Sequence, residues 1–134
     1  MLNMRNSKIA DPQVLHSRTQ DFIYHHPRKL LPYLNTLFEG CAILFAEMEH
    51  QLLDGSHLIG SVDVLLTVAY DGRKVRVPIE IKHAQLNGAM KQLRRYQPYI
   101  EGCADYGLAV AGSPKNFEVG GVDFRRDHSD YIKL

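Results

Sequence analysis

The chain has 134 residues and a formal net charge of +1, with 45% hydrophobic and 23% charged residues. This length predicts one compact domain, residues 1–134, because two domains would each have too small a core. The composition excludes a disordered or fibrous chain, and the near-neutral charge argues against a protein whose whole surface is basic for binding nucleic acid.

Two helices are predicted before the first strand. Asp11 or Ser17 can cap a helix that runs toward His25. The Pro27 that follows interrupts this helix, because the residue before a proline disfavours helical backbone. A short second helix is predicted over residues 29–38.

Three strands are predicted next. Residues 41–49 begin apolar and then alternate, and residues 59–70 are rich in β-branched side chains on both faces, which is typical of a buried central strand. Residues 54–56 have the composition of a turn. Asp71-Gly72 is a strong hairpin signal, and residues 74–82 then alternate charged and apolar side chains. The last two strands should therefore pair antiparallel.

A long helix and a further strand follow the hairpin. Residues 85–100 have apolar side chains at helical spacing, and residues 105–111 are typical of a buried strand. Two shorter extended segments are predicted at residues 117–124 and 131–134. This order predicts an α/β (α+β) fold with a mixed central sheet flanked by helices, because the strand after the long helix can return parallel through a right-handed crossover.

Cellular location and redox state can be predicted from what the sequence lacks. No stretch reaches the roughly 18 apolar residues that a membrane span needs, and residues 1–13 lack the apolar core of a signal peptide. We therefore expect a cytoplasmic protein with no membrane partner. Cys41 and Cys103 are the two cysteines, too few for a disulfide framework and not at zinc-binding spacing, so both should be free thiols.

Two carboxylates are predicted to meet across the hairpin. Pairing about Asp71-Gly72 places Asp63 opposite Glu80. Two buried like charges repel, and a hard cation such as Mg²⁺ or Mn²⁺ compensates them through oxygen ligands. Lys82 lies two residues beyond Glu80 and so on the same face of the strand, where its ammonium would stabilise charge on a phosphate or orient the attacking water.

Each of these residues also has an ordinary structural explanation. A Glu-x-Lys pattern in a hairpin is often a solvated cross-strand ion pair, and such pairs contribute little to stability. Asp63, however, interrupts the apolar run of residues 62–66, where an unpaired carboxylate is costly. A buried Asp63 needs a partner, which favours the metal site.

The residues of this region resemble a known family. The motifs are GSVD at residues 60–63, EIK at 80–82 and QLRRY at 92–96. They look like GxxD, ExK and QxxxY, the motif set of the RecB-like branch of the PD-(D/E)XK nuclease superfamily. The amino-acid sequence of this region is especially similar to the nuclease domain of the archaeal NucS endonucleases. The resemblance covers about residues 15–112 and leaves residues 113–134 as a C-terminal extension.

The resemblance implies a restriction-endonuclease-like core and a catalytic centre that uses Mg²⁺ or Mn²⁺. The residues it assigns are the metal ligands Asp63, Glu80 and the backbone carbonyl of Ile81, the catalytic Lys82, and Gln92 and Tyr96, which would support the site or contact DNA. From the residues alone, Tyr96 is equally well explained as a core residue and Gln92 as a solvated one.

One position departs from the family pattern. The RecB-like and NucS families often have a glutamate on the first helix that completes the metal site, and Gln20 stands at the matching position. Asp21 adjoins it but would point about 100° away on a helix. Glu47 or Glu49 on the first strand are alternative ligands, although exposed strand charges are the ordinary interpretation.

The long helix carries the residues expected to contact DNA. Lys91, Arg94 and Arg95 flank the QxxxY motif, and His83 directly follows Lys82. Basic side chains beside a metal site are suited to a phosphodiester backbone. Each of them is equally well explained as a side chain that keeps the outer face of the helix hydrated.

Three functions are consistent with these patterns. The preferred one is a metal-dependent endonuclease or exonuclease that hydrolyses phosphodiester bonds of DNA. The second is a catalytically inactive nuclease-fold protein that binds nucleic acid or another protein, with Gln20 as a sign of lost activity. The third is a Holliday-junction resolvase, which would require a homodimer that presents two sites to a four-way junction.

Overall fold

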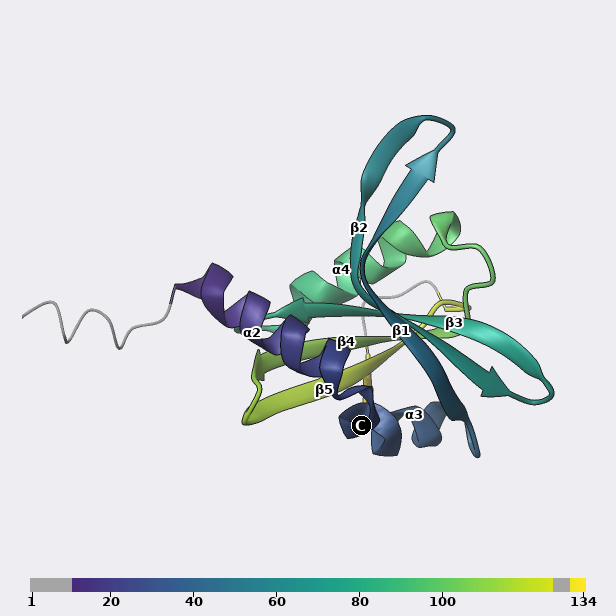
Figure 1. The fold of residues 1–134 in the computed structure, drawn as a ribbon, viewed down its shortest axis with the longest axis horizontal. Helices are drawn as coiled ribbons and strands as arrows, with labels where there is room; N and C mark the ends of the chain where they lie inside the picture. Colours follow the sequence, from purple (N-terminus) through teal and green to yellow (C-terminus); the bar gives the residue numbers. More distant parts are fainter. Residues whose placement is uncertain (1–10, 127–130) are drawn as a thin grey trace, which may run out of the picture.

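The computed structural model describes residues 11–126 and 131–134. Within them the chain forms a six-stranded mixed sheet and three α-helices, an α+β fold as the sequence predicts. The strands lie side by side in the order of the sequence (Figure 1). The strands are β1 (Ala42–Asp54), β2 (His57–Tyr70), β3 (Arg73–Lys82), β4 (Tyr106–Ser113), β5 (Asn116–Asp123) and β6 (Ile132–Lys133), and the helices are α2 (Pro12–His25), α3 (Leu31–Leu37) and α4 (Leu86–Tyr96), with 3₁₀ turns η1 (Pro27–Leu30) and η2 (Gln97–Tyr99).

The hairpin between β2 and β3 forms at the predicted turn. Asp71 and Gly72 have φ values of 53° and 75°, the left-handed conformation that a two-residue turn of this kind requires at both positions. The antiparallel register runs from Tyr70 opposite Arg73 to Val64 opposite Ile79. β4 returns beside β3 in parallel after α4, as predicted. The sheet is therefore mixed.

The first hairpin is longer than predicted. β1 continues past residue 49 to Asp54, and β2 begins at His57, so the two strands form an arm that rises away from the rest of the sheet (Figure 1). The predicted turn lies at its tip. Leu52 is buried with Val62 and Tyr96 near the foot of the arm, which explains why β1 continues beyond the point where its alternation weakens.

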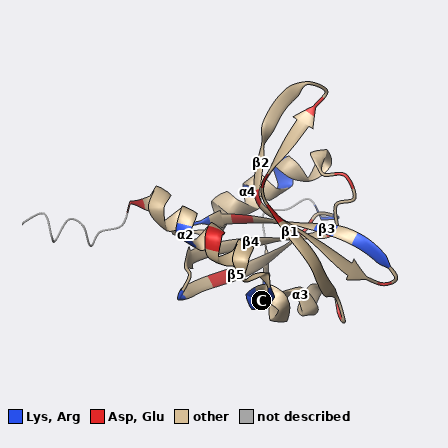
Figure 2. Cartoon of the chain, in the orientation of Figure 1, with Lys and Arg blue, Asp and Glu red and all other residues tan. Residues whose placement is uncertain are grey.

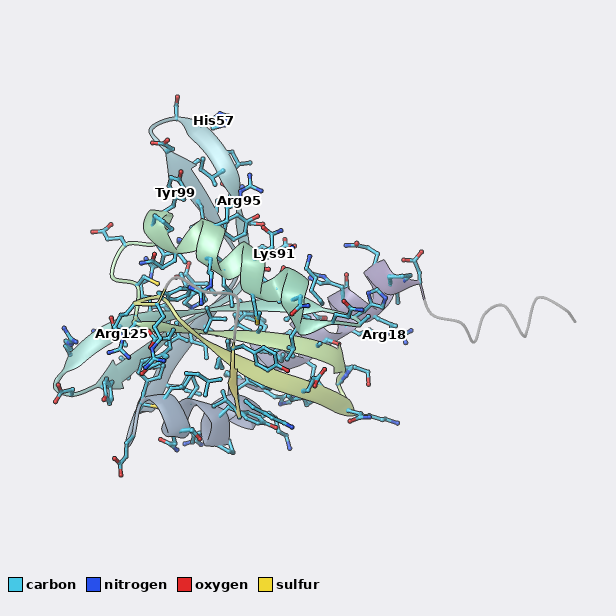
Figure 3. All side chains as sticks on the ribbon, turned by 180° about the vertical axis from the view of Figure 1, so that it is seen from behind. Arg18, His57, Lys91, Arg95, Tyr99 and Arg125 are labelled. Carbon is cyan, nitrogen blue, oxygen red and sulfur yellow. The ribbon has the colours of Figure 1, made fainter. Side chains whose placement is uncertain are left out.

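Helices pack against both faces of the sheet. Figures 1 and 3, which view the molecule from opposite sides, show α2 and α4 on opposite faces. Ile23 of α2 joins the larger cluster with Val64 and Ile79, and Leu93 of α4 packs with Ala109 of β4 on the other face. In the described ranges, no helix has both the length and the apolar character needed to cross a membrane.

α4 is shorter than the predicted helix over residues 85–100. It ends at Tyr96 and continues as the 3₁₀ turn η2, which contains Pro98. A proline lacks the backbone N–H that a continuing α-helix would use, so the helix changes form there. At the other end of the chain, α2 begins at Pro12 after the side-chain cap of Asp11, the first of the two predicted caps.

Candidate active site

The sheet forks at the two motif carboxylates. β2 pairs with β3 as far as Val64 and then follows β1 into the arm, while β3 pairs with β4 as far as Lys82. Asp63 and Glu80 are the first residues beyond the last paired residues of β2 and β3. Their side chains form hydrogen bonds where backbone hydrogen bonds would otherwise continue the pairing. The backbone N–H of Ile81 donates to Asp63 Oδ2 at 2.8 Å, and the backbone N–H of Asp63 donates to Glu80 Oε1 at 3.4 Å. The predicted meeting of Asp63 and Glu80 is confirmed.

Gln20 also substitutes for a missing strand partner. Its Nε2 donates to the backbone carbonyl of Asp63 at 3.0 Å, and the side chain is only 5% exposed. A carbonyl at a fork has no neighbouring strand to bond, and a buried carbonyl without a partner is costly. Gln20 therefore fixes the backbone that carries Asp63, which is a positioning role that a glutamate could fill only in its protonated form.

Replacing Gln20 by glutamate is expected to destabilise the protein without creating a better site. The new carboxylate would face the Asp63 carbonyl, so it would either repel that oxygen or take up a proton. We expect a loss of about 1 to 3 kcal/mol in the free energy of unfolding at neutral pH. Urea unfolding of the variant beside the exposed Asp21→Asn control measures it. A stability equal to that of the wild type would contradict the assigned hydrogen bond.

His16 is a site residue that the sequence did not reveal. Its Nε2 lies 3.1 Å from Asp63 Oδ2, and it stands one helical turn before Gln20 on the same face of α2. Its Nδ1 is buried and has no hydrogen-bond partner among the described residues. The sequence signal that could have identified His16 is its position four residues before Gln20. That spacing becomes informative only when α2 is known to lie against Asp63.

The electrostatics of the fork favour one shared proton. Burial, together with the hydrogen bond to Asp63 and the negative charge of Asp63, raises the pKa of Glu80 from its ordinary value to about 10. Burial also opposes ionisation of Asp63, but hydrogen bonds from His16, Glu80 and the Ile81 N–H lower its pKa overall. The hydrogen bond to Asp63 raises the pKa of His16. At neutral pH Asp63 is therefore ionised and Glu80 is protonated.

Lys82 extends from β3 on the same face as Glu80. Its stem lies over Gly88 at the start of α4, where an added Cβ would be 3.4 Å from Lys82 Cε. In the part of the chain that the structure describes, no carboxylate lies within ion-pair distance of its ammonium. The positive charge is thus available to an anion that reaches the fork.

The third motif lies against the first one. Tyr96 is buried, and a Cβ at Gly60 would collide with its hydroxyl, so the tyrosine of QxxxY packs on the glycine of GxxD at the foot of the arm. Gln92 is half-buried on the same helix. No hydrogen bond links either side chain to the carboxylates within the described residues. A direct part in chemistry for these two residues stays a prediction.

The basic residues of α4 divide into two groups. Lys91 and Arg95 are exposed along one side of the helix, with the Arg95 guanidinium 5.9 Å from the centre of the Tyr96 ring (Figure 3). Arg94 instead donates to the backbone carbonyls of Asp123 and Arg126 at 3.4 and 2.6 Å. Arg94 therefore ties α4 to the end of β5, whereas Lys91 and Arg95 are exposed to solvent.

The two acidic residues of β1 have different surroundings. Glu47 is held by Arg76 at 3.2 Å and by His50 at 3.0 Å, away from the fork. Glu49 has a φ of 54°, and it falls in the gap of the β1–β2 register opposite Asp63. A left-handed residue inside a strand is strained, and such strain often occurs at functional sites. Glu49 is the β1 residue placed beside the candidate site.

The donor atoms at the fork fit a divalent cation in kind. They are two carboxylates, an imidazole and the carbonyl of Ile81, and a hard cation such as Mg²⁺ prefers oxygen ligands. Among residues 11–126 and 131–134, no three His, Cys, Asp or Glu side chains converge closely enough to hold a metal ion. Asp63 Oδ2 is instead shared between His16 and the Ile81 N–H, so a cation would displace contacts within the site.

Comparisons with known proteins found no relative of this chain. No protein-family model matches the chain, and neither the curated proteins nor the solved structures gave a match. The resemblance to the PD-(D/E)XK nucleases therefore rests on the motif residues and their placement. Two of the three motifs, at residues 60–63 and 80–82, meet at the fork, and the third, at residues 92–96, packs against the first.

Proposed function

We propose that the chain is a metal-dependent nuclease of the PD-(D/E)XK superfamily that hydrolyses phosphodiester bonds of DNA. The observation that carries this proposal is the fork of the sheet, where the carboxyl groups of Asp63 and Glu80 meet and Lys82 extends from the same face of β3 as Glu80. A carboxylate pair that must hold a proton at neutral pH is also a pair that exchanges it for a cation.

The topology supports a restriction-endonuclease-like core. α2 precedes an antiparallel β1–β2–β3 meander, and α4 then connects β3 to a parallel β4. This is the order expected for such a core, helix, three strands, helix, strand. The fork between β2 and β3 brings polar side chains to an end of the sheet that backbone hydrogen bonds would otherwise occupy.

In the proposed mechanism, Asp63, Glu80 and the Ile81 carbonyl would hold the cation, and His16 would supply a further donor. When bound, the cation supplies Lewis-acid polarisation of the phosphate and compensates the two carboxylates. Lys82 orients the attacking water and stabilises the charge that develops on the phosphoryl oxygens. A new bond forms between phosphorus and the water oxygen while the bond to the leaving oxygen breaks, and the proton given up by the water passes to solvent, from which the leaving oxygen is protonated.

The exposed cations of α4 provide a place for the DNA backbone. Gly88, Lys91 and Arg95 recur at helical spacing on one side of α4, and Gly88 lies under the stem of Lys82. A strand bound at Lys91 and Arg95 would thus pass the candidate active site. His83, exposed directly after Lys82, would contact the same strand.

Gln20 does not favour the alternative of an inactive protein. Its hydrogen bond to the Asp63 carbonyl gives it a function in an intact site, so its presence needs no loss of activity to explain it. A Holliday-junction resolvase would additionally need a homodimer that presents two such sites. Hydrolysis by a single site is therefore the function that the geometry supports best.

Cleavage of labelled DNA tests the proposal. Single-stranded, duplex, flap and four-way-junction substrates should be incubated with Mg²⁺, Mn²⁺ or EDTA, and the products compared for the wild type and Asp63→Asn. We expect cleavage that needs the metal and that falls by about a thousandfold in the variant, since the cation contributes several kcal/mol. Absence of metal-dependent cleavage on all four substrates would overturn the proposal.

A further inference from the structure

An exposed tyrosine continues the row of cations on α4. Lys91 and Arg95 lie on the exposed side of the helix, and Tyr99 follows Arg95 four residues later, in η2. Figure 3 shows the three side chains in succession toward the arm of β1 and β2. We call these three residues the α4–η2 stripe. Because Gly88, which precedes Lys91 on the same side of the helix, lies under the stem of Lys82, the stripe begins beside the candidate active site.

The ring of Tyr99 is accessible to a ligand, and its backbone is held in place. The side chain is 39% exposed, and no other aromatic ring packs on it among the residues that the structure describes. Tyr96 and Ile100, which flank η2, are buried together at the foot of the arm, and Pro98 restricts the backbone between them. A ring held in this way loses little conformational freedom on binding, so Tyr99 is suited to stack on a flat group.

The cations of the stripe are spaced for the backbone of one nucleic-acid strand. Lys91 and Arg95 are four residues apart, which is about 6 Å along the helix axis. Within the described ranges, no carboxylate lies at ion-pair distance from either side chain. Two such cations can contact successive phosphates, and the ring of Tyr99 lies one step further along, where a base can stack. Phosphate contacts beside an aromatic ring are the combination by which proteins hold single strands.

The arm disfavours a duplex at the stripe. It rises beside the end of α4 (Figure 1), and no lysine or arginine occurs in the sequence from Glu39 to Gly72. In Figure 2 the arm has acidic but no basic positions, whereas α4 has basic positions beside its foot. A duplex would bring the phosphates of its second strand to the arm, which contributes no side-chain cation to bind them. A single strand can instead place its phosphates on α4 and turn its bases toward the arm.

We propose that the α4–η2 stripe binds single-stranded DNA, with phosphates on Lys91 and Arg95 and an unpaired base stacked on Tyr99. This inference rests on the proposed function, because it names the kind of DNA that the same site would cleave. The stripe itself makes and breaks no bond, so its binding of DNA can be measured without cleavage. In a duplex the bases are already stacked on one another, and Tyr99 would have none to contact.

Binding of labelled DNA in EDTA tests the stripe, since no metal ion is then present to support cleavage. The probe is a fluorescein-labelled oligothymidylate of about twelve nucleotides, either free or annealed to oligoadenylate. Fluorescence anisotropy should show that the free strand binds more tightly than the duplex. Tyr99→Leu should weaken binding of the free strand by about tenfold, the effect of one lost stacking contact, whereas Tyr99→Phe should bind like the wild type. Tyr131→Leu, which replaces another tyrosine that is 39% exposed, is the matched control and should also bind like the wild type.

The salt dependence of binding separates the phosphate contacts from the stacking contact. Arg95→Met should reduce the slope of log affinity against log salt concentration by about 0.7, and Tyr99→Leu should leave the slope unchanged. Equal affinity for the free strand and the duplex, unchanged binding by Tyr99→Leu, or no binding of either probe would overturn the inference. Intact binding without metal-dependent cleavage in the separate assay would instead overturn the proposed function and leave the binding site in place.

Discussion

Replacing Glu80 by glutamine is expected to abolish metal-dependent cleavage of DNA and to make the metal-free protein more stable. Glutamine has the shape of a protonated glutamic acid, and its amide can donate a hydrogen bond where the acid donates its proton. It cannot exchange that proton for a cation. Cleavage should therefore fall by about a thousandfold or more, equivalent to roughly 4 kcal/mol of transition-state stabilisation.

The gain in stability should depend on pH in a definite direction. The pKa of Glu80 is about 10 in the folded protein, and its ordinary value is 4.5, so the folded state binds more protons than the unfolded state between these values. The contribution of Glu80 to the stability of the wild type is therefore fully present at and below pH 4.5, and it is lost as the pH rises toward about 10. The variant lacks this dependence, and at pH about 8 its advantage should be on the order of 1 to 3 kcal/mol.

Urea unfolding in EDTA at several pH values measures the difference between the two proteins. His16 and Asp63 titrate in both, so subtracting the wild-type from the variant free energy isolates most of the contribution of Glu80. Glu118→Gln, which changes an exposed glutamate of β5, is the matched control and should alter neither stability nor cleavage. A stability difference that does not grow with pH would contradict the shared proton at the fork.

The regular elements of this fold could be predicted because their signals are local. Asp71-Gly72 determines a turn by its own backbone preference, and the alternation of residues 74–82 then fixes which side chains share a face. The register that follows from this turn is enough to place Asp63 beside Glu80. The arm of β1 and β2 is longer than local patterns indicate, since Leu52 is buried by residues distant in sequence.

The candidate site was predictable only where it lies within one hairpin. His16 reaches Asp63 from α2, 47 positions away, and no periodicity in either segment indicates that α2 packs against the fork. Gln20 stands out in the sequence as a departure from a motif, yet its role comes from an unpaired carbonyl that a sequence pattern does not record. Long-range placement of helices accounts for both residues.

The same limit explains the basic residues of α4. Lys91, Arg94 and Arg95 are equivalent in the sequence as positive charges beside a motif. Their surroundings differ because the end of β5 passes one side of α4, where Arg94 finds two backbone carbonyls. The side that remains open carries Lys91 and Arg95. Sequence reasoning can identify such a group of cations, but packing decides which of them remain exposed.

Replacing Lys82 by methionine is expected to separate cation binding from catalysis. Methionine keeps an unbranched stem over Gly88 and removes only the ammonium. Since Lys82 acts on the substrate phosphate in the proposed mechanism, cleavage should fall by about 10² to 10⁴-fold. The carboxylates at the fork are unchanged, so binding of Mn²⁺ should still stabilise the fold.

Thermal unfolding with and without Mn²⁺ distinguishes the two roles. The rise in Tm on adding Mn²⁺ should be as large in Lys82→Met as in the wild type, or larger because a competing positive charge is gone, and it should disappear in Glu80→Gln. Lys91→Met, on the exposed side of α4, is the matched control for loss of one lysine and should keep both the Tm rise and most of the cleavage of a small phosphodiester. If Lys82→Met lost the Mn²⁺ response together with cleavage, Lys82 would organise the cation site rather than act on the phosphate, and the division of roles at the fork would have to be reassigned.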